Sequence, residues 1–319
     1  IYCTLSLESM KAVRVHAVGG PEVLTIEEVP IIEPAESQVV VRIEAIGINP
    51  VETYIRSAKT GRAPPSLPYT PGQDGAGTVH SIGSKVTKWK VGDRVFTTSS
   101  ISGTYAQYSL CEEQGLQPLP ENTSFDAGAA IHVPYHTAYH ALFHIAKAQA
   151  GDVVFIHGCS GATGMAALQF AKARGFTVIG SAGTAEGLRL IAKHGADFSV
   201  NHREDGYLAK VLEFTGGAGV NVIIEMLANI NLGNDLAYLA KGGRVAVIGS
   251  RGPVQIDARD LMSRRASIHG VFMANATPEE VTEIDQAVQD GLEAGQLHPV
   301  VYLALPFDKV SESHVQVIN

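Results

Sequence analysis

The sequence contains only three cysteines and no long apolar run, and each scarcity excludes a class of protein. Cys3, Cys111 and Cys159 are widely spaced and odd in number, so they cannot supply a disulfide framework or a cysteine-rich zinc site. This usage favours a reducing compartment, and we expect a cytoplasmic protein. No apolar run reaches the ~18 residues of a membrane-spanning helix, so we expect no membrane insertion.

Basic residues are also scarce, with 24 Lys and Arg against 32 Asp and Glu and a net charge of −8. That balance gives no general support for binding nucleic acid or an anionic membrane. The 319 residues, 45% of them hydrophobic, are enough for about two domains with a sizeable core. Residues 1–9 lack the basic start and apolar middle of a signal peptide. We interpret them as an extension or a mobile terminus, and expect the fold to begin at Met10.

The pattern of apolar residues divides the rest of the chain into two regions with different predicted secondary structure. Up to about residue 120 the pattern gives short strands with turn signals and little helix, which is typical of a compact barrel-like domain. From Gly151 strand and helix patterns alternate, which predicts a parallel doubly wound sheet. Strands are expected at residues 38–47, 77–83, 92–96 and 105–110, and then at 152–157, 176–181, 197–200, 221–225, 244–249 and 267–272. Helices are expected at 162–174, at a segment that closes over 235–241 before Gly242 and Gly243, and from Pro278 to about residue 294.

The most informative stretch is 152–164, an apolar strand followed by glycines at 158, 161 and 164 and then a helix start. Glycine there permits a sharp turn and lets backbone N–H groups approach a pyrophosphate at the positive end of the helix. The pattern predicts a dinucleotide site, although an ordinary tight strand-to-helix turn is the alternative. The residues expected to cradle the pyrophosphate are Ser160, Gly161, Ala162 and Thr163.

The tip of the next strand indicates which dinucleotide binds. An acidic residue that would hold a ribose 2′-hydroxyl is missing there, where the chain has Ser181 and Gly183. An uncharged tip leaves room for a 2′-phosphate, and the candidate donors are Ser181, Arg189, His202 and Arg203. We therefore expect NADPH in preference to NADH. The alternative is that His202 and Arg203 form a solvated surface pair.

Several long segments carry a family resemblance: residues 47–56, 68–77, 91–95, 137–139, 201–204, 224–229 and 249–252, with the glycine loop. With them the chain resembles the quinone oxidoreductase branch of the medium-chain dehydrogenase/reductase superfamily, the branch that includes zeta-crystallin. The resemblance spans residue 10 to about residue 319. It implies an α/β fold with a GroES-like β-barrel domain and a Rossmann-type doubly wound parallel sheet domain. The implied domains are 10–133 with 271–319 for the first, which is discontinuous, and 134–270 for the second.

Two departures from the family pattern stand out. Family members usually finish with a further strand that rejoins the first domain, and we expect this strand to be missing after Ile318 and Asn319. An unpaired edge in the barrel would be a stability liability. Many relatives also carry a Lys where this chain has Gly187, which weakens the argument for a 2′-phosphate.

The chain lacks the zinc ligands of the alcohol dehydrogenases in the same superfamily. Those enzymes place a Cys near Gly47 and a His-Glu pair after Gly72, whereas this chain has Asn49 and Asp74 at the matching places. We expect no zinc and hence no Lewis acid in the reaction. A second histidine pattern, residues 132, 136, 140 and 144, recurs every four residues, which puts the rings on one helical face, although Pro134 interrupts it. Because zinc motifs of this kind include a carboxylate, we interpret these histidines as hydrogen-bonded or exposed.

Without a metal, the cofactor brings the hydride and the protein brings orientation and electrostatics. Asn49 and Tyr54 could donate hydrogen bonds to the oxyanion that quinone reduction creates. The resemblance also implies that Tyr54 contacts the cofactor. The structural alternatives are a turn set by Asn49 before Pro50, and simple packing of Tyr54. Thr137 could bond the nicotinamide side of the cofactor or cap a helix.

Two further groups of cofactor residues follow later strands. Asn229 and Asn231 come after the fourth parallel strand and could reach the ribose or the nicotinamide amide. Gly249, Ser250 and Arg251 follow the fifth, at the carboxyl edge where such sheets bind ligands. Arg251 could meet a phosphate or close the cleft, or form a surface salt bridge.

Three functional hypotheses follow. The first is an NADPH-dependent reductase of quinones, and the second a reductase of other electrophilic carbonyls such as α,β-unsaturated ones. The third, which the resemblance suggests, is an NADPH-binding protein with a structural role or affinity for AU-rich RNA. The resemblance also implies a homodimer or homotetramer, in which strand 267–272 could pair with its copy across a two-fold axis.

Overall fold

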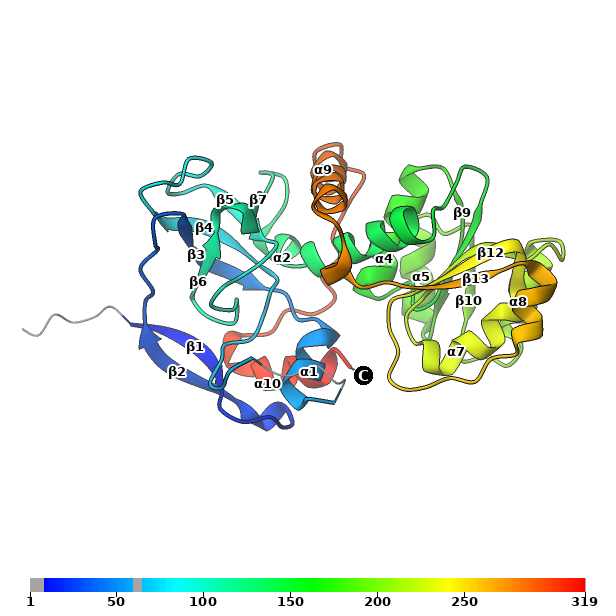
Figure 1. Ribbon diagram of the computed structural model, residues 1–319, viewed down its shortest axis with the longest axis horizontal. Helices are drawn as coiled ribbons and strands as arrows, with labels where there is room; N and C mark the ends of the chain where they lie inside the picture. The colour runs from blue at the N-terminus through cyan, green and yellow to red at the C-terminus, as the bar shows by residue number, and fades with distance from the viewer. Residues whose placement is uncertain (1–8, 60–64, 319) are drawn as a thin grey trace, which may run out of the picture. The chain divides into compact units, whose positions relative to one another are not determined.

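The computed structural model describes residues 9–59 and 65–318 and divides into two compact bodies (Figure 1). The first body contains the described residues up to Val133 and those from Pro299 onward, and the second runs from Pro134 to His298. Residues 1–8 of the expected extension lie outside the described part. Ser9 belongs to the fold, because it opens the first strand and its hydroxyl donates to Glu28 at 2.8 Å.

The first body is built on antiparallel strands. Five of them form one sheet in the order β6-β3-β4-β5-β7, and β1 pairs with β2 in a separate hairpin. Their bounds are β1 Ser9–Val15, β2 Leu24–Pro30, β3 Gln38–Ile46, β4 Gly75–Ile82, β5 Arg94–Thr97, β6 Tyr108–Glu112 and β7 Leu116–Pro118. Inward-facing Val39, Val41 and Val95 form the core of the sheet. The hairpin is joined to the rest by single bridges from Ala12 and Val15, so the strands curl into the expected GroES-like barrel.

Short helices complete the first body, and α1 is the one that bears on the site. It begins with Pro50 after Asn49, where proline loses no hydrogen bond, and it ends at Ala58, which has a left-handed φ of 52°. The helical segments are η1 Pro21–Val23, α1 Pro50–Ser57, η2 Glu113–Gly115, α2 Phe125–Gly128, η7 Phe307–Lys309 and α10 Val310–Gln316.

The second body contains a parallel six-stranded sheet in the order β10-β9-β8-β11-β12-β13. Its strands are β8 Val153–Ile156, β9 Thr177–Ala182, β10 Phe198–Asn201, β11 Val220–Glu225, β12 Leu239–Val247 and β13 Ser267–Gly270. All six expected strands form. Because β8 leads to β9 on one side and lies beside β11 on the other, the strand order reverses at β8, as in a doubly wound sheet.

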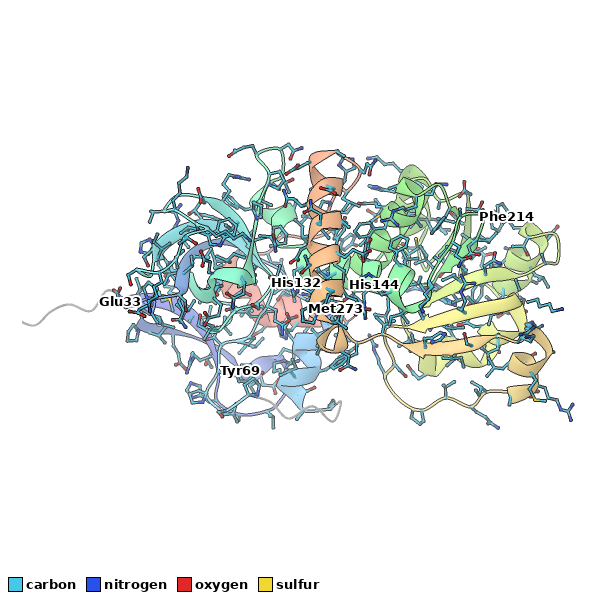
Figure 2. The ribbon with its side chains drawn as sticks, turned by 45° about the horizontal axis from the view of Figure 1, so that its top comes forward. Glu33, Tyr69, His132, His144, Phe214 and Met273 are labelled. Atoms are coloured by element: carbon cyan, nitrogen blue, oxygen red, sulfur yellow. The ribbon has the colours of Figure 1, made fainter. Side chains whose placement is uncertain are left out.

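Helices connect the parallel strands of the second body: α4 Ala162–Ala173, α5 Ala185–Lys193, α6 Tyr207–Phe214, α7 Ala228–Asp235 and α8 Ala258–Arg264. Helix α3 Thr137–Tyr139 precedes the first of these strands, and α9 Pro278–Glu293 follows the last. Shorter turns are η3 His132–His136, η4 His140–Ile145, η5 Leu236–Tyr238 and η6 Met273–Asn275. Phe214, labelled in Figure 2, stacks on Phe198 of β10 with ring centroids 4.8 Å apart. This contact fastens the end of α6 to the sheet.

The expected helix end at residues 235–241 is wrong. The helical turns stop at Tyr238, and Gly242 and Gly243 lie inside β12. Pairing with β11 slips there, because Val220 lies opposite Leu239 and Val222 lies opposite Arg244. The two glycines form an irregularity at the start of a strand, and Gly242 takes the positive φ of 78° that this kink requires.

The expected return to the first domain at residue 271 is also too early, since the structure places it at Pro299. Helix α9 belongs to the second body because Glu283 accepts a hydrogen bond from the Tyr139 hydroxyl at 2.8 Å. At the far end, Gln169 of α4 holds both backbone groups of His298, at 2.8 and 2.9 Å. A sequence pattern of helix after strand does not show which body the helix packs on.

The histidine-rich segment is helical throughout, as η3, α3 and η4 in succession. Pro134 does not break it, because it lies in the first turn, where a missing N–H costs no helical hydrogen bond. The last turn is wide, with the Ala146 N–H donating to Ala141 at 2.9 Å.

Candidate functional site

The glycine loop joins β8 to α4 in the second body. Gly158 has a φ of 54°, and the first hydrogen bond of the helix runs from the Met165 N–H to Gly161 at 2.8 Å. The Gly161 N–H donates to Gly158 at 2.9 Å, and the N–H groups of Ala162, Thr163 and Gly164 in the first turn are the ones available to an anion. A Cβ on Gly164 would lie 2.4 Å from the Gly158 oxygen, so only glycine lets the helix pack so close to the loop.

The four residues expected to cradle a pyrophosphate are accessible. Gly161 and Ala162 are exposed, and Ser160 and Thr163 are half-buried. Gly187 of α5 is buried directly beside them, because a Cβ there would lie 3.0 Å from the Ser160 hydroxyl. Gly187 thus allows α5 to lie close to the loop.

Ser181 was expected to be a phosphate donor, but the structure gives it another task. It is fully buried, its hydroxyl accepts from the Gly158 N–H at 3.2 Å, and its carbonyl accepts from the Cys159 N–H at 2.8 Å. Ser181 therefore ties the glycine loop to β9. Its direct contact with a phosphate stays a prediction.

The tip of β9 brings together three other predicted residues. A Cβ built on Gly183 would lie 2.8 Å from the His202 ring and 2.9 Å from the Arg203 side chain, so both cover this glycine. Burial, with the nearby charges of His157 and Arg203, lowers the pKa of His202. Arg203 is then the fixed positive charge at this position, while Arg189 is exposed on α5.

The loops after β11 and β12 are bound to each other. The Asn229 side-chain oxygen accepts from the Arg251 N–H at 2.8 Å, and the Gly249 carbonyl accepts from the Ala228 N–H at 2.9 Å. Ser250 is exposed and donates to Gly252 at 2.7 Å. Asn231 instead turns toward the sheet, where its amide donates to Glu225 at 3.1 Å. Asn229 and Asn231 thus already have protein partners.

These residues share one edge of the sheet. The glycine loop, Gly183, His202 with Arg203, Asn229 and the 249–251 loop follow the carboxyl ends of five neighbouring parallel strands. Doubly wound sheets bind ligands at this edge, at the point where the strand order reverses. The structure therefore gathers most of the predicted cofactor residues of the second body at one place.

Beneath the loop lies a charged cluster that the sequence reasoning missed. The His157 ring lies 2.7 Å from Asp235 and 3.3 Å from Glu225, and all three side chains are buried. Burial raises the pKa of Glu225 and that of Asp235 to about 7 each and lowers that of His157. The sequence did carry a signal for this cluster. A polar residue stands at the end of each of two apolar strands, His157 directly after β8 and Glu225 as the last residue of β11.

In the first body, Asn49 has a structural task. It precedes α1, its N–H donates to Glu52 at 2.6 Å, and its side-chain amide donates to Asp74 at 2.9 Å. Asp74 also lies 3.0 Å from the ring of His132, labelled in Figure 2. Burial, reinforced by Asp74, raises the pKa of Glu52 to about 8. Asn49 thus has structural partners at the start of α1, and its hydrogen bond to an oxyanion stays a prediction.

Tyr54 and Thr137 complete the set of predicted residues. Tyr54 is half-exposed on α1 of the first body. Thr137 is half-buried inside the continuous helical segment, with His136 before it already helical. It is therefore not at the head of a helix, and the N-cap alternative for Thr137 is wrong.

The residues at the zinc position of the related dehydrogenases do not fit that metal. Asn49 offers an amide that is engaged by Asp74, and the Asp74 carboxylate is held by Asn49, His132 and the Val133 N–H. Tetrahedral zinc in that position needs thiolate or imidazole ligands with an open place for substrate. Asn49 and Asp74 therefore do not form a zinc site of that kind.

Two family models match the chain. The model described as alcohol dehydrogenase GroES-like domain matches residues 35–121, and the one described as zinc-binding dehydrogenase matches residues 162–290. The first covers the antiparallel sheet and the second runs from the start of α4 into α9.

Curated relatives match nearly the whole chain. A quinone oxidoreductase of Lama guanicoe is 49% identical over 306 residues, which cover 96% of this chain and 92% of the relative. A quinone oxidoreductase of Homo sapiens is 47% identical over 313 residues, 97% and 94% of the two chains. Among solved structures, the Escherichia coli quinone oxidoreductase complexed with NADPH superposes with a TM-score of 0.85 at 30% identity, over 96% of this chain and 95% of that one.

Proposed function

Since the chain belongs to the quinone oxidoreductase branch of the medium-chain dehydrogenase/reductase superfamily, we propose that it reduces quinones with NADPH. The relatives' activity and the NADPH of the solved structure fit the groups that this chain carries at its sheet edge. No helix among residues 9–59 and 65–318 is both long and apolar enough to cross a membrane.

The observation that carries the proposal is the tip of β9. Gly183 offers no side chain and no carboxylate, and Arg203 lies against it with His202. A 2′-phosphate placed there would gain a charge-assisted hydrogen bond from the guanidinium, whereas a 2′-hydroxyl would not. The pyrophosphate would be held by the backbone N–H groups at the start of α4 and the close packing of Gly164.

NADPH supplies the hydride when bound, and the protein supplies orientation and charge stabilisation. Reduction of a quinone places negative charge on its oxygen, and a hydroxyl donor stabilises that charge. Tyr54 is the candidate donor, because Asn49 already gives one amide hydrogen to Asp74. Solvent can complete the protonation, so no base of tuned pKa is required.

The test is a fluorescence titration of the purified chain with NADPH and, in parallel, NADH, followed by a quinone turnover assay. Arg203→Gln is expected to weaken NADPH binding about tenfold and to leave NADH binding unchanged, because one charge-assisted bond is lost. Arg259→Gln, which removes an exposed arginine from α8, is the matched control. An equal loss for both nucleotides, or no loss, would contradict the placement of the 2′-phosphate.

We also propose a homodimer or homotetramer built through β13. This strand forms one edge of the six-stranded sheet and pairs with β12. An edge strand can extend its sheet across a two-fold axis. Light scattering of the wild type and of Ile268→Pro tests this, since proline in β13 should lower the mass to that of the monomer; an unchanged mass would place the interface elsewhere.

Cytoplasmic location and binding of AU-rich RNA stay predictions. The described cysteines, Cys111 and Cys159, are buried free thiols, which suits a reducing compartment. Competition between NADPH and an AU-rich oligonucleotide tests RNA binding near the nucleotide site.

A further inference from the structure

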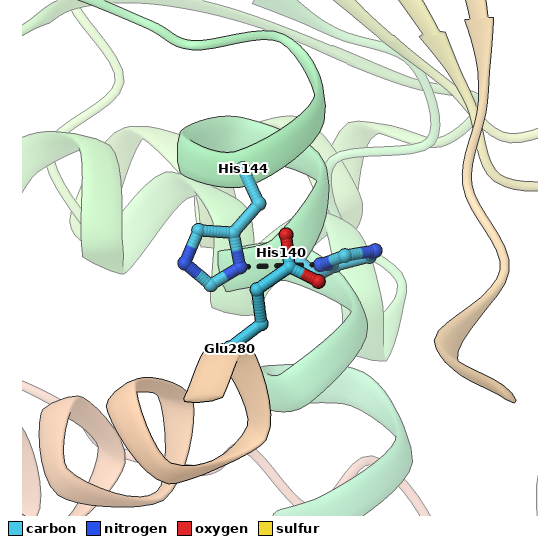
Figure 3. Close-up of side chains that lie close together, drawn as sticks. All are labelled: His140, His144 and Glu280. Atoms are coloured by element: carbon cyan, nitrogen blue, oxygen red, sulfur yellow. Dashed lines mark hydrogen bonds between the residues drawn. The ribbon is translucent and has the colours of Figure 1, made fainter. Parts of the chain in front are cut away.

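Two histidine rings of the second body face each other within one helical turn. His140 and His144 both lie on η4, and their Nδ1 atoms are 3.2 Å apart (Figure 3). His140 is buried, and the side chain of His144 is only 10% exposed. The sequence predicted hydrogen-bonded rings here because the pattern offered no carboxylate.

Helix α9 supplies that carboxylate. One ligand atom each of His140, His144 and Glu280 lies within 4.8 Å of the other two. Glu280 is in the first turn of α9, and its Oε2 accepts from the Thr277 N–H at 2.9 Å in a capping box. The cap holds one carboxylate oxygen and leaves the other for the rings, toward which the side chain extends in Figure 3.

The spacing suits a tetrahedral metal ion. Two Zn–N bonds of about 2.0–2.1 Å at a tetrahedral angle place their nitrogens roughly 3.3 Å apart. The observed separation of the two Nδ1 atoms is 3.2 Å. An ion between the rings therefore needs little movement of either side chain.

The groups around the rings have the arrangement that supports metal ligands. The far nitrogen of His144, Nε2, lies 3.3 Å from Glu283, which also accepts from the Tyr139 hydroxyl at 2.8 Å. Arg174 donates to that hydroxyl at 3.2 Å. A carboxylate on the far nitrogen orients a ligating imidazole and raises its basicity.

We propose that His140, His144 and Glu280 bind a zinc-class divalent transition-metal ion, which fastens the start of α9 to η4. Two imidazoles and one carboxylate are a known zinc ligand set, and water can fill the fourth position. The ion neutralises Glu280 beside the rings and crosslinks two segments that are distant in sequence. Its role is structural, because its ligands are none of the residues assigned to the nucleotide.

The experiment uses the full chain after chelator treatment, titrated with Co²⁺ and then Zn²⁺. We expect one Co²⁺ per chain, with the intense visible bands of a four-coordinate site, displaced by Zn²⁺. Zn²⁺ should also raise the melting temperature, since a ligand that binds only the folded state stabilises it. Failure of Co²⁺ to bind at one per chain, or weak bands of a hydrated ion, would overturn the site.

Variants separate a built site from adventitious binding. Glu280→Gln keeps a residue suited to the capping box, so the fold should persist while Co²⁺ affinity falls at least tenfold. His140→Gln and His144→Gln should abolish the visible bands, and Glu283→Gln should weaken binding about tenfold by releasing His144. His269→Gln removes an exposed histidine of the same body and should change nothing. Unchanged bands in Glu280→Gln and His144→Gln would show adventitious metal only.

Discussion

The predicted site residues of the two bodies differ in kind. In the second body, the shape of the predicted site depends on the backbone, because glycines 158, 164 and 183 form the turn, the close helix packing and the strand tip on which Arg203 lies. In the first, it depends on side chains, and Asn49 is already bound to Asp74. A backbone site can be recognised from spacing, because glycine has few other reasons to be there. A side-chain role depends on partners that spacing does not reveal.

The bodies also differ in how they bury acid. Glu52 in the first body has Asp74 as a neighbour that raises its pKa, to about 8. Glu225 and Asp235 in the second body share the ring of His157, and each has a pKa of about 7. In the first arrangement an acidic neighbour favours the protonated, neutral form of Glu52, whereas in the second two acids share one imidazole.

The largest expected effect is on the pH dependence of stability, and it concerns the buried carboxyl of Glu52. Glu52 binds its proton more tightly in the folded chain, so stability falls as pH rises from about 4.5 to about 8 and is constant above. Glu52→Gln should remove this fall and leave the variant roughly 3–5 kcal/mol more stable than wild type at pH 9, with little difference at pH 4. The measurement is urea unfolding followed by fluorescence of Trp89, the only tryptophan, which is buried in the first body.

Exposed Glu33 provides the control for this experiment. Glu33→Gln should keep the wild-type pH profile, because its carboxyl is in water in both states. Parallel profiles for Glu52→Gln and the wild type would refute the buried, protonated state of Glu52.

The apolar patterns were sufficient to predict the architecture. The six parallel strands, the glycine loop and the capped helix after Pro278 all follow from runs of apolar residues and turn signals. What failed depended on distant partners. Gly242 and Gly243 resemble a helix stop until the slip against β11 is seen, and the sequence does not show that the Ser181 hydroxyl accepts from the Gly158 N–H. No local pattern pairs His157 with Asp235, or Glu280 with His140.

The second prediction concerns the close packing of the glycine loop. Gly164→Ala should destabilise the second body by roughly 2–3 kcal/mol, because the new methyl group meets the Gly158 oxygen and the Cys159 backbone. The loop must move, so NADPH binding should weaken about a hundredfold by the same free energy. Fluorescence titration and thermal unfolding measure the two effects. Gly252→Ala, with open space around the added methyl group, should match the wild type.

The third prediction compares two helix caps. Thr184 caps α5 through the Gly187 N–H at 3.0 Å, and Asn49 precedes α1 and also binds buried Asp74. Thr184→Ala should cost about 1 kcal/mol, and Asn49→Ala about 2–3 kcal/mol, since the second leaves a buried carboxylate short of a donor. Urea unfolding followed by circular dichroism measures both. Equal losses would mean that the bond to Asp74 adds nothing to the cap.

The smallest effect on stability is expected at Tyr54, and it decides whether the first body contributes to the chemistry. The side chain is half-exposed, so Tyr54→Phe should change the free energy of unfolding by no more than about 0.5 kcal/mol. If its hydroxyl stabilises charge on the quinone oxygen, kcat should fall about tenfold while the Kd for NADPH stays the same. Tyr302→Phe, at a tyrosine that is 83% exposed in the same body, controls for loss of a surface hydroxyl. An unchanged kcat would assign Tyr54 to packing, and a weaker Kd with normal kcat would assign it to cofactor binding alone.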